Sequence, residues 1–297
     1  MLADQVSVSV AVQGADILGE VPLWCERTKK IWWIDLRRPA LQSYDPATGK
    51  HSAQRMPADM VIGAIAMRKE GGFLLATNTG FYFFNPDDGM PPEPLINPEA
   101  HLPGMRLNDG KCDRRGRFWC GSMLDGKREP VGTLYKLNTD LTCEAMHGGI
   151  VVPNSVAWSL DDKTMYLADT HNQVIWSFDY DLDDGAISNK RVFKDWTHQL
   201  GRPDGSTVDS EGFLWNCMVA VGQVVRLAPD GRVDRVIQLP ISNATCPAFG
   251  GEDLRTLYVT SNSQRLTAAQ LAREPLAGSL FAIDVGVAGV AEPRFGH

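Results

Sequence analysis

Six short segments are spaced evenly along the chain, and four of them have an oxygen-bearing side chain at one matching position. The segments cover residues 18–24, 61–66, 106–113, 152–158, 202–209 and 245–251. Their alignment places at the matching position Glu20, Gly63, Asn108, Asn154, Asp204 and, in the last segment, Pro247 or its neighbour. Buried carboxylate and amide groups in apolar surroundings must be hydrogen-bonded or coordinated. Such a set of oxygens suits a hard or borderline divalent cation.

The same segments contain common turn sequences, which gives a second interpretation. Residues 108–110 read Asn-Asp-Gly, residues 153–155 Pro-Asn-Ser and residues 203–205 Pro-Asp-Gly. Asn, Asp, Gly and Pro supply turn geometry on any protein surface, so each sequence taken singly indicates a turn. Their equivalent placement in successive segments favours a shared binding site.

A repeat of about 45 residues positions these segments. Behind each one lies a short apolar or aromatic run, and successive runs begin 42, 45, 47, 48 and 44 residues apart. The runs begin at Ile31, Phe73, Phe118, Met165, Phe213 and Leu257. A second strand-like stretch follows each run, beginning at Leu41, Phe81, Thr133, Val174, Val224 and Gly278.

Short β-branched and aromatic stretches bounded by turn residues predict antiparallel sheets. Six such small sheets can bury a common core when they pack radially, so we expect an all-β, six-bladed β-propeller formed by one domain of residues 1–297. The oxygen-bearing segments would be the first strand of each blade and would line the central channel. A β-sandwich is the alternative, but it would not need so regular a period. Residues 267–273 predict a helix inserted between two strands of the sixth unit.

Composition narrows the compartment and the partners. The chain has 36 acidic and 29 basic residues, a formal charge of −7 and no basic stripe, which argues against nucleic acid as a partner. Residues 1–12 lack the pattern of a signal peptide, and no apolar stretch reaches the roughly 18 residues of a membrane span. We therefore expect a cytoplasmic protein without membrane contact. The six cysteines are scattered and predict buried thiols, with a Cys112–Cys120 bridge as the alternative.

The sequence resembles the senescence-marker-protein/gluconolactonase (regucalcin-like) family of six-bladed propellers over nearly its whole length. The resemblance is carried by Leu-Gly-Glu at 18–20, Arg-Leu-Asn-Asp-Gly-Lys at 106–111, Pro-Asn at 153–154, Pro-Asp-Gly at 203–205, Ala-Phe-Gly-Gly at 248–251 and Leu-Tyr-Val-Thr-Ser at 257–261. It implies that Glu20, Asn154 and Asp204 bind one divalent metal ion, which could be Ca²⁺, Zn²⁺, Mn²⁺, Mg²⁺ or Fe²⁺. It also implies that Arg106 and Asn108 contact a sugar substrate. Asp125 is the nearest match to an acidic substrate-binding residue of some members.

Three departures from the family pattern concern the pocket. Val21 and Ser155 stand where the family usually has Gly, and their bulkier side chains could narrow the pocket. Residues 218–222, Met-Val-Ala-Val-Gly, replace a Trp-Gly-Gly stretch of many relatives. The substrate preference could therefore differ as well.

The resemblance implies metal-dependent hydrolysis of a sugar lactone, with Asp204, or a water that it orients, as general base. No Gly-x-Ser-x-Gly elbow is present, which disfavours a serine nucleophile. Two other functions fit the same residues: a non-catalytic propeller that acts as a scaffold or calcium-binding regulator, and a phosphotriester hydrolase. The motifs distinguish neither among sugar lactones nor among oligomeric states.

Overall fold

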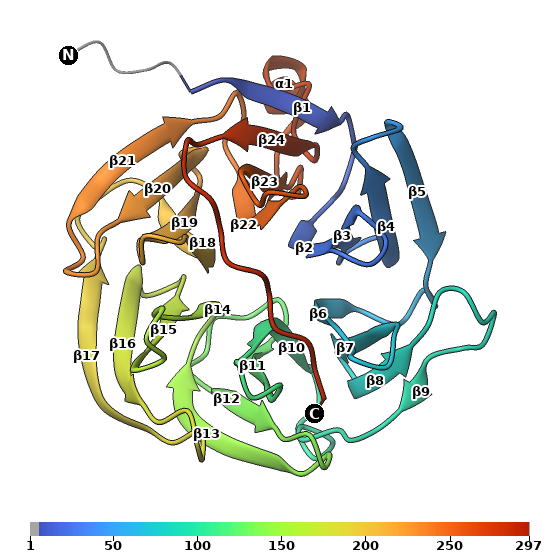
Figure 1. The fold of residues 1–297 in the computed structure, drawn as a ribbon, viewed down its shortest axis with the longest axis vertical. Coiled ribbons are helices and arrows are strands. Elements are labelled where there is room, and N and C mark those ends of the chain that lie inside the picture. Colours follow the sequence, from blue (N-terminus) through green and yellow to red (C-terminus); the bar gives the residue numbers. More distant parts are fainter. Residues whose placement is uncertain (1–5, 297) are drawn as a thin grey trace.

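Six four-stranded antiparallel sheets stand in a ring in the computed structural model, which describes residues 6–296 (Figure 1). Residues 1–5 and His297 lie outside the described part. Of the N-terminal segment of residues 1–12 considered above, the structure therefore describes residues 6–12. Blade 1 consists of β2 (Gly19–Cys25), β3 (Lys30–Asp35), β4 (Ala40–Asp45) and β5 (Lys50–Arg55). Blade 2 consists of β6 (Ile62–Met67), β7 (Phe73–Thr77), β8 (Gly80–Phe84) and β9 (Glu93–Pro94). Blade 3 consists of β10 (Met105–Cys112), β11 (Phe118–Leu124), β12 (Gly132–Leu137) and β13 (Cys143–Ile150). Blade 4 consists of β14 (Pro153–Trp158), β15 (Thr164–Asp169), β16 (Val174–Tyr180) and β17 (Ile187–Asp195). Blade 5 consists of β18 (Arg202–Val208), β19 (Leu214–Val219), β20 (Gln223–Leu227) and β21 (Val233–Gln238). Blade 6 consists of β22 (Ala244–Gly250), β23 (Thr256–Ser261), β24 (Leu280–Asp284) and β1 (Val8–Val12).

The predicted six-bladed β-propeller is confirmed. In each blade, the three segments predicted from the sequence form the three inner strands. The inner strands β2, β6, β10, β14, β18 and β22 lie nearest the axis, and the apolar runs form the second strand of each blade (Figure 1). These second strands are buried on both faces because each blade packs between two neighbours, so they read as continuous apolar runs. The outer strands were not predicted, since a strand such as β5 is polar and exposed along its length.

The ring closes through the two ends of the chain. Strand β1 pairs with β24, with Ser9 opposite Ala282, so the first described strand completes the blade that the last three strands begin. This pairing covers the edge of β24 that would otherwise be open, and it joins the two ends of the chain in one sheet. The predicted helix is present as α1 (Ala268–Arg273) between β23 and β24, and Thr267 caps its N-terminus.

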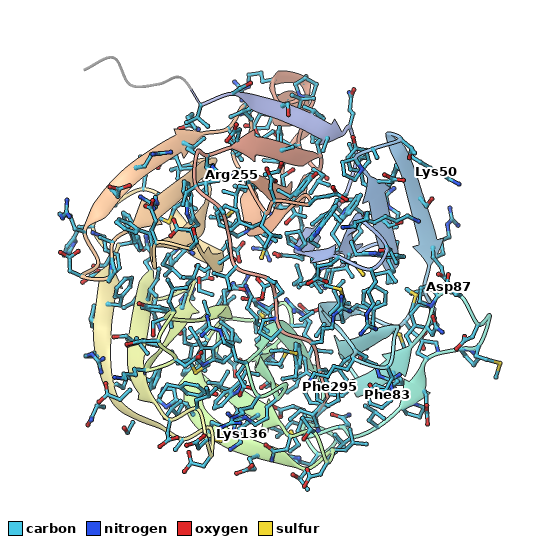
Figure 2. The ribbon with its side chains drawn as sticks, in the orientation of Figure 1. Lys50, Phe83, Asp87, Lys136, Arg255 and Phe295 are labelled. Atoms are coloured by element: carbon cyan, nitrogen blue, oxygen red, sulfur yellow. The ribbon has the colours of Figure 1, made fainter. Side chains whose placement is uncertain are left out.

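A C-terminal strap, residues 285–296, then runs across one face of the ring and over its centre (Figure 1). Its backbone bonds to several blades: Ser210 N donates to Ala288 O at 2.9 Å, and Phe295 N donates to Met67 O at 2.8 Å. Phe295 also packs against Phe83, with 6.0 Å between the ring centroids (Figure 2). The strap therefore ties together blades that are distant in the sequence.

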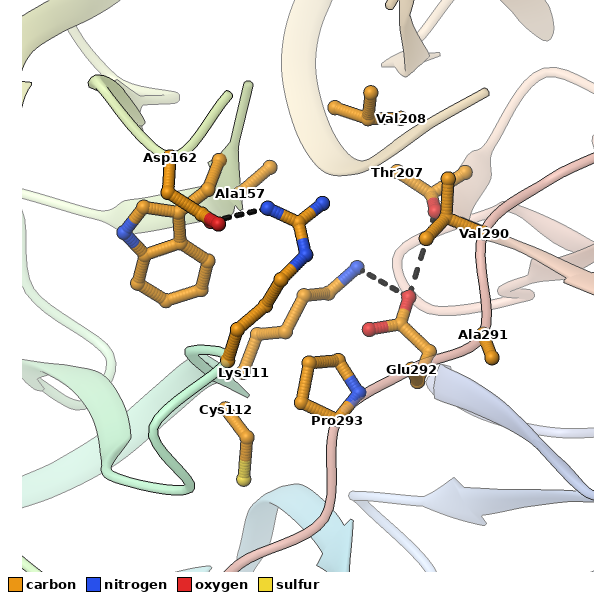
Figure 3. Close-up of a pocket in the computed structure, with 12 residues that line it drawn as sticks. Lys111, Cys112, Ala157, Asp162, Thr207, Val208, Val290, Ala291, Glu292 and Pro293 are labelled. Carbon is orange, nitrogen blue, oxygen red and sulfur yellow. Dashed lines mark hydrogen bonds and ion pairs between the residues drawn. The ribbon is translucent and has the colours of Figure 1, made fainter. Parts of the chain in front are cut away.

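The strap closes one end of the central channel with a buried ion pair. Lys111, near the end of β10, donates to Glu292 Oε1 at 2.8 Å and to Ser206 O at 3.1 Å (Figure 3). Thr207 lies on the other side of the same carboxylate. Since Glu20, Asn154 and Asp204 lie near the opposite ends of their inner strands, the candidate site faces the other end of the channel.

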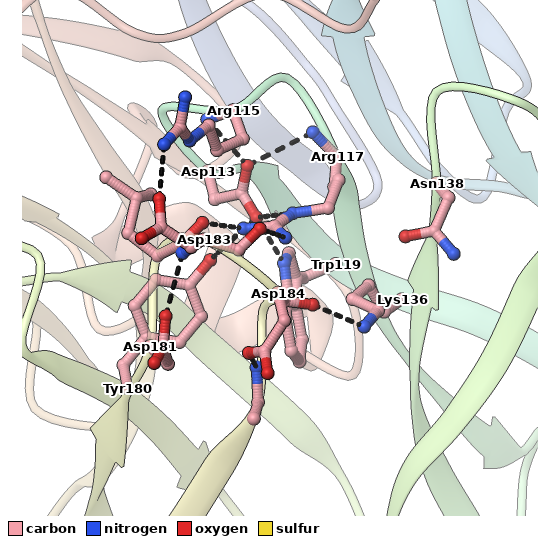
Figure 4. Close-up of polar contacts among 12 residues, drawn as sticks. Asp113, Arg115, Arg117, Trp119, Lys136, Asn138, Tyr180, Asp181, Asp183 and Asp184 are labelled. Atoms are coloured by element: carbon pink, nitrogen blue, oxygen red, sulfur yellow. Dashed lines mark hydrogen bonds and ion pairs between the residues drawn. The ribbon is translucent and has the colours of Figure 1, made fainter.

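A buried carboxylate joins blade 3 to blade 4. Asp113, which is 1% exposed, accepts hydrogen bonds from Trp119 Nε1 at 2.9 Å, Arg117 Nε at 2.7 Å and Tyr180 Oη at 2.7 Å (Figure 4). Tyr180 belongs to β16 of the next blade, while the other two belong to blade 3. Such a network stabilises only when every member is satisfied.

We expect Asp113→Ala to lower the free energy of unfolding by about 3–5 kcal/mol, because it leaves a buried guanidinium and two ring donors without their acceptor. Urea unfolding measures the change. The matched control is Asp183→Ala, which removes an ion pair to Arg115 whose carboxylate side chain is 84% exposed, and should cost less than about 1 kcal/mol. Equal losses in the two variants would show that the Asp113 network does not join the blades.

The cysteine prediction is confirmed: all six are free, five are buried and Cys143 is half-buried. Cys112 and Cys120 therefore do not form a bridge. No helix in residues 6–296 has the length and apolar character needed to cross a membrane.

Candidate functional site

Every inner strand shifts its pairing register at the same level of the channel. The shifts lie between Glu20 and Leu23, Ile62 and Ala64, Leu107 and Gly110, Asn154 and Ala157, Pro203 and Ser206, and Ala244 and Pro247. Such β-bulges re-aim the side chains of the residues they contain. The four predicted oxygen-bearing residues, Glu20, Asn108, Asn154 and Asp204, lie in or beside these bulges and line one cavity of about 330 Å³.

Two blades contribute no such oxygen ligand for local reasons. A Cβ on Gly63 would lie 2.1 Å from Leu107 O, so only glycine fits between the inner strands of blades 2 and 3. In blade 6 the bulge contains Thr245 and Cys246, so these residues, and not Pro247, occupy the matching position. The hydroxyl of Thr245 donates to Gly19 O at 2.7 Å and is directed at the neighbouring backbone.

The backbone adopts a left-handed conformation immediately after two of the site residues. Val21 has φ 48° and Ser155 has φ 59°, a region that β-branched and most other L-residues avoid. Val21 is 4% exposed, and Ser155 is fully buried and donates its hydroxyl to Asp204 O. These surroundings hold a conformation that glycine would adopt without strain.

The expectation that these two side chains could narrow the pocket is not met. Neither Val21 nor Ser155 is among the residues that line the cavity. Ser155 instead connects blades 4 and 5, because its hydroxyl also accepts a hydrogen bond from Asn216 Nδ2 at 2.9 Å. The departures from glycine therefore affect the strands that carry Glu20, Asn154 and Asp204 and leave the cavity wall unchanged.

Two carboxylates face the cavity without an ion-pair contact, although the charge of Arg106 acts on both. Among the described residues, neither Glu20 nor Asp204 forms an ion pair. Burial, followed by the charges of Asp204 and Asp109, raises the pKa of Glu20 well above its usual value. Burial and the charge of Asp109 raise the pKa of Asp204 in the same way. Each carboxylate is thus destabilised by the others, and a cation between them would relieve the repulsion.

The neighbouring amides are held in a hydrogen-bonded chain. Arg106 Nη1 donates to Asn108 Oδ1 at 2.5 Å, and Asn108 Nδ2 donates to Asn154 Oδ1 at 2.9 Å. Asn154 Nδ2 donates to Thr170 Oγ1 at 2.7 Å, and that hydroxyl donates to Pro203 O at 2.7 Å. The chain fixes which end of each amide is oxygen, and leaves Asn154 Oδ1 one lone pair for a cation.

These residues fit a hard divalent cation. Within residues 6–296, no three His, Cys, Asp or Glu side chains gather closely enough to form a metal site by themselves. A cation would therefore depend on the carboxylates of Glu20 and Asp204, on the amide oxygen of Asn154 and on water. Buried charges in proteins are paired or coordinate metals, and these two carboxylates lack a pair.

A cluster of two guanidinium groups forms another part of the cavity lining. Asp125 accepts from both terminal nitrogens of Arg37, at 2.6 and 2.7 Å, and from Arg106 Nε at 3.1 Å. The hydrogen bonds from Arg37 are the largest cause of the lowered pKa of Asp125, which is therefore ionised. Asp125 lines the cavity as predicted, but its oxygens hold the two arginines in place.

Sequence reasoning missed several residues at or beside this site, among them Asp109 and Arg37. Asp109, which is 8% exposed, lies in the same bulge as Asn108, and burial raises its pKa. In a regular strand, neighbours point to opposite faces, so only the bulge could have indicated that both lie near the channel. Arg37 lies in the loop after β3, where no repeat or motif marked it.

The comparisons with known proteins identify the family of the chain. Residues 18–263 match the family model described as "SMP-30/Gluconolactonase/LRE-like region". The chain belongs to the SMP-30/gluconolactonase family. A relative named 6-deoxy-6-sulfogluconolactonase, from Pseudomonas putida, is 36% identical over 97% of this chain and 98% of its own. Regucalcin from Xenopus laevis is 32% identical over 98% of both chains.

A solved structure of this family shares the fold closely. A protein described as a calcium-binding protein, regucalcin, from Agrobacterium tumefaciens aligns with a TM-score of 0.94 and 28% identity over 98% of both chains. The matched region contains every predicted site residue of this chain, from Glu20 to Asp204.

The strained bulge gives a direct test of local structure. We expect Val21→Gly to be more stable than Val21→Ala by about 1 kcal/mol, because alanine keeps the left-handed strain that glycine avoids. Thermal or urea unfolding measures the order. At Val225, a buried β20 residue with ordinary backbone, the order should reverse, since glycine weakens a regular strand. The same order at both positions would refute the assigned strain.

Proposed function

We propose that this chain is a metal-dependent lactonase that hydrolyses a sugar lactone to the aldonic acid. The observation that carries the proposal is that two carboxylates without ion-pair contacts, those of Glu20 and Asp204, line the same cavity as Arg106. Membership of the SMP-30/gluconolactonase family supports it, as does the similarity to a relative named as a sugar-derived lactonase. Glu20, Asn154 and Asp204 would hold one divalent ion. Similarity to a protein described as calcium-binding supports a divalent ion at this position.

When bound, the ion would supply a Lewis-acid charge that polarises the lactone carbonyl. Asp204, which is 7% exposed, would orient a water and accept its proton as that water attacks the carbonyl carbon. The ring carbon–oxygen bond then breaks, and the proton passes to the departing alkoxide oxygen. The products are the open-chain acid and its hydroxyl group, with no covalent bond to the protein.

Arg106 would oppose the negative charge that develops on the carbonyl oxygen. Its Nε and Nη1 are used by Asp125 and Asn108, while Nη2 has no hydrogen-bond partner among the described residues. The guanidinium is 5% exposed, so its position is set before the substrate arrives. Asn108 and Asp125 would orient Arg106, and Asn108 would also contact a sugar hydroxyl.

The reaction class is tested by following proton release from a panel of aldonolactones with metal-stripped protein. We expect turnover of at least one sugar lactone that requires added Mn²⁺, Zn²⁺, Ca²⁺, Mg²⁺ or Fe²⁺. Tight Ca²⁺ binding with no lactone turnover would favour a calcium-binding regulator. Faster hydrolysis of a phosphotriester than of any lactone would favour a phosphotriester hydrolase.

The residue assignment is tested by two variants. Asp204→Ala should lower kcat/KM by at least about 100-fold even with excess metal, because the proton acceptor is lost. Asn108→Ala should act mainly through KM, raising it about fivefold, which is the effect of one lost hydrogen bond. Steady-state kinetics separate the two, and Asp230→Ala at an exposed turn is the control. Normal turnover by Asp204→Ala would contradict the assignment.

A further inference from the structure

Four arginine side chains line the cavity: Arg106 belongs to strand β10, and the other three come from separate loops. Besides Arg37 and Arg106, the cavity is lined by Arg128, which follows β11, and by Arg265, which follows β23. Arg37 and Arg106 each form an ion pair with Asp125, whose single negative charge offsets one of their two positive charges. The whole chain carries a formal charge of −7, so this gathering of cations runs against its overall charge.

Arg128 and Arg265 differ from the other two because no protein carboxylate neutralises them. Within the described part of the chain, neither forms an ion pair, and Arg128 makes one hydrogen bond, to Lys127 O at 3.1 Å. Arg202, at the start of β18, is a third arginine nearby. Burial and then the charges of Arg265 and Arg202 lower the pKa of Arg128, which places three cations close enough to repel one another.

Repulsion among neighbouring cations is unfavourable, and a bound anion removes it. Guanidinium groups bind phosphate, sulfonate and carboxylate oxygens through paired, charge-assisted hydrogen bonds. Arg128 and Arg265 line the same cavity as Glu20 and Asp204. One small molecule can therefore touch both regions, provided that it has a neutral reacting end and an anionic far end.

We propose that the lactone taken by this site carries an anionic group, a phosphate, sulfonate or carboxylate, on the carbon farthest from the carbonyl, and that Arg128 and Arg265 bind this group. The proposal rests on the proposed lactonase function and adds the substrate class to it. The reacting carbonyl would face Asp204 and Arg106, while the anionic group would remain at the cavity mouth. A neutral sugar lactone would leave these cations without a counter-charge.

The test compares gluconolactones that differ only at carbon 6, bearing a hydroxyl, a phosphate or a sulfonate group. We expect the wild-type protein to favour at least one anionic lactone over the neutral one by at least tenfold in kcat/KM. The phosphate and sulfonate compounds together distinguish a general anion site from one that is selective for either group. Raising the salt concentration should reduce the preference, because exposed charges are screened.

Substitutions locate the preference. In Arg128→Gln and in Arg265→Gln, the ratio of kcat/KM for the anionic lactone to that for the neutral lactone should fall at least fivefold. The matched control is Arg232→Gln, an exposed arginine in the turn before β21 that does not line the cavity, and its ratio should match the wild type. An equal preference for neutral and anionic lactones, or a ratio unchanged in both variants, would overturn the proposal.

Failure of the lactonase function is recognised separately. If no lactone is turned over with any metal, calorimetry on the wild-type protein compares 6-phosphogluconate and 6-sulfogluconate with gluconate. Binding of a 6-substituted acid at least tenfold tighter than gluconate, lost in Arg128→Gln, would support the anion site without the reaction. Equal binding of all three acids would overturn it.

Discussion

The β-bulge that recurs in the six inner strands is the constraint on which the site depends. A regular strand alternates its side chains between two faces, so consecutive residues could not both lie near the channel. The register shift lets Asn108 and Asp109 lie together in one strand and brings Glu20 and Asp204 to the same level from different blades. The register shift comes with a strained, left-handed backbone at Val21 and Ser155. The buried surroundings of these two residues keep that strain from relaxing.

Opposite charges are separated within the same cavity. Carboxylates of Glu20 and Asp204 lie at the bulges, while the guanidinium groups of Arg37 and Arg106 are held by Asp125. If all these charges met directly, they would form ordinary ion pairs and leave nothing for a ligand. The hydrogen-bonded chain from Arg106 through Asn108 keeps the two regions apart with neutral amides.

The sequence predicted the parts of this structure that repeat. Apolar runs at a steady period identify strands buried on both faces, and the polar residues before them could be aligned because every blade begins in the same way. Strand β5 and the closing strand β1 were not predicted, because their residues are largely exposed and have no apolar pattern. Arg37, Arg128 and Arg265 escaped because loops bring them to the cavity, and loop geometry leaves no periodic signal.

The strap of residues 285–296 covers one end of the central channel. Lys111 and Glu292 are joined beneath the strap, and we infer that a molecule that enters beside the arginines leaves by the same route. A retained product would then block the entry of the next substrate. Substrate and product would share the end of the channel that the strap leaves uncovered.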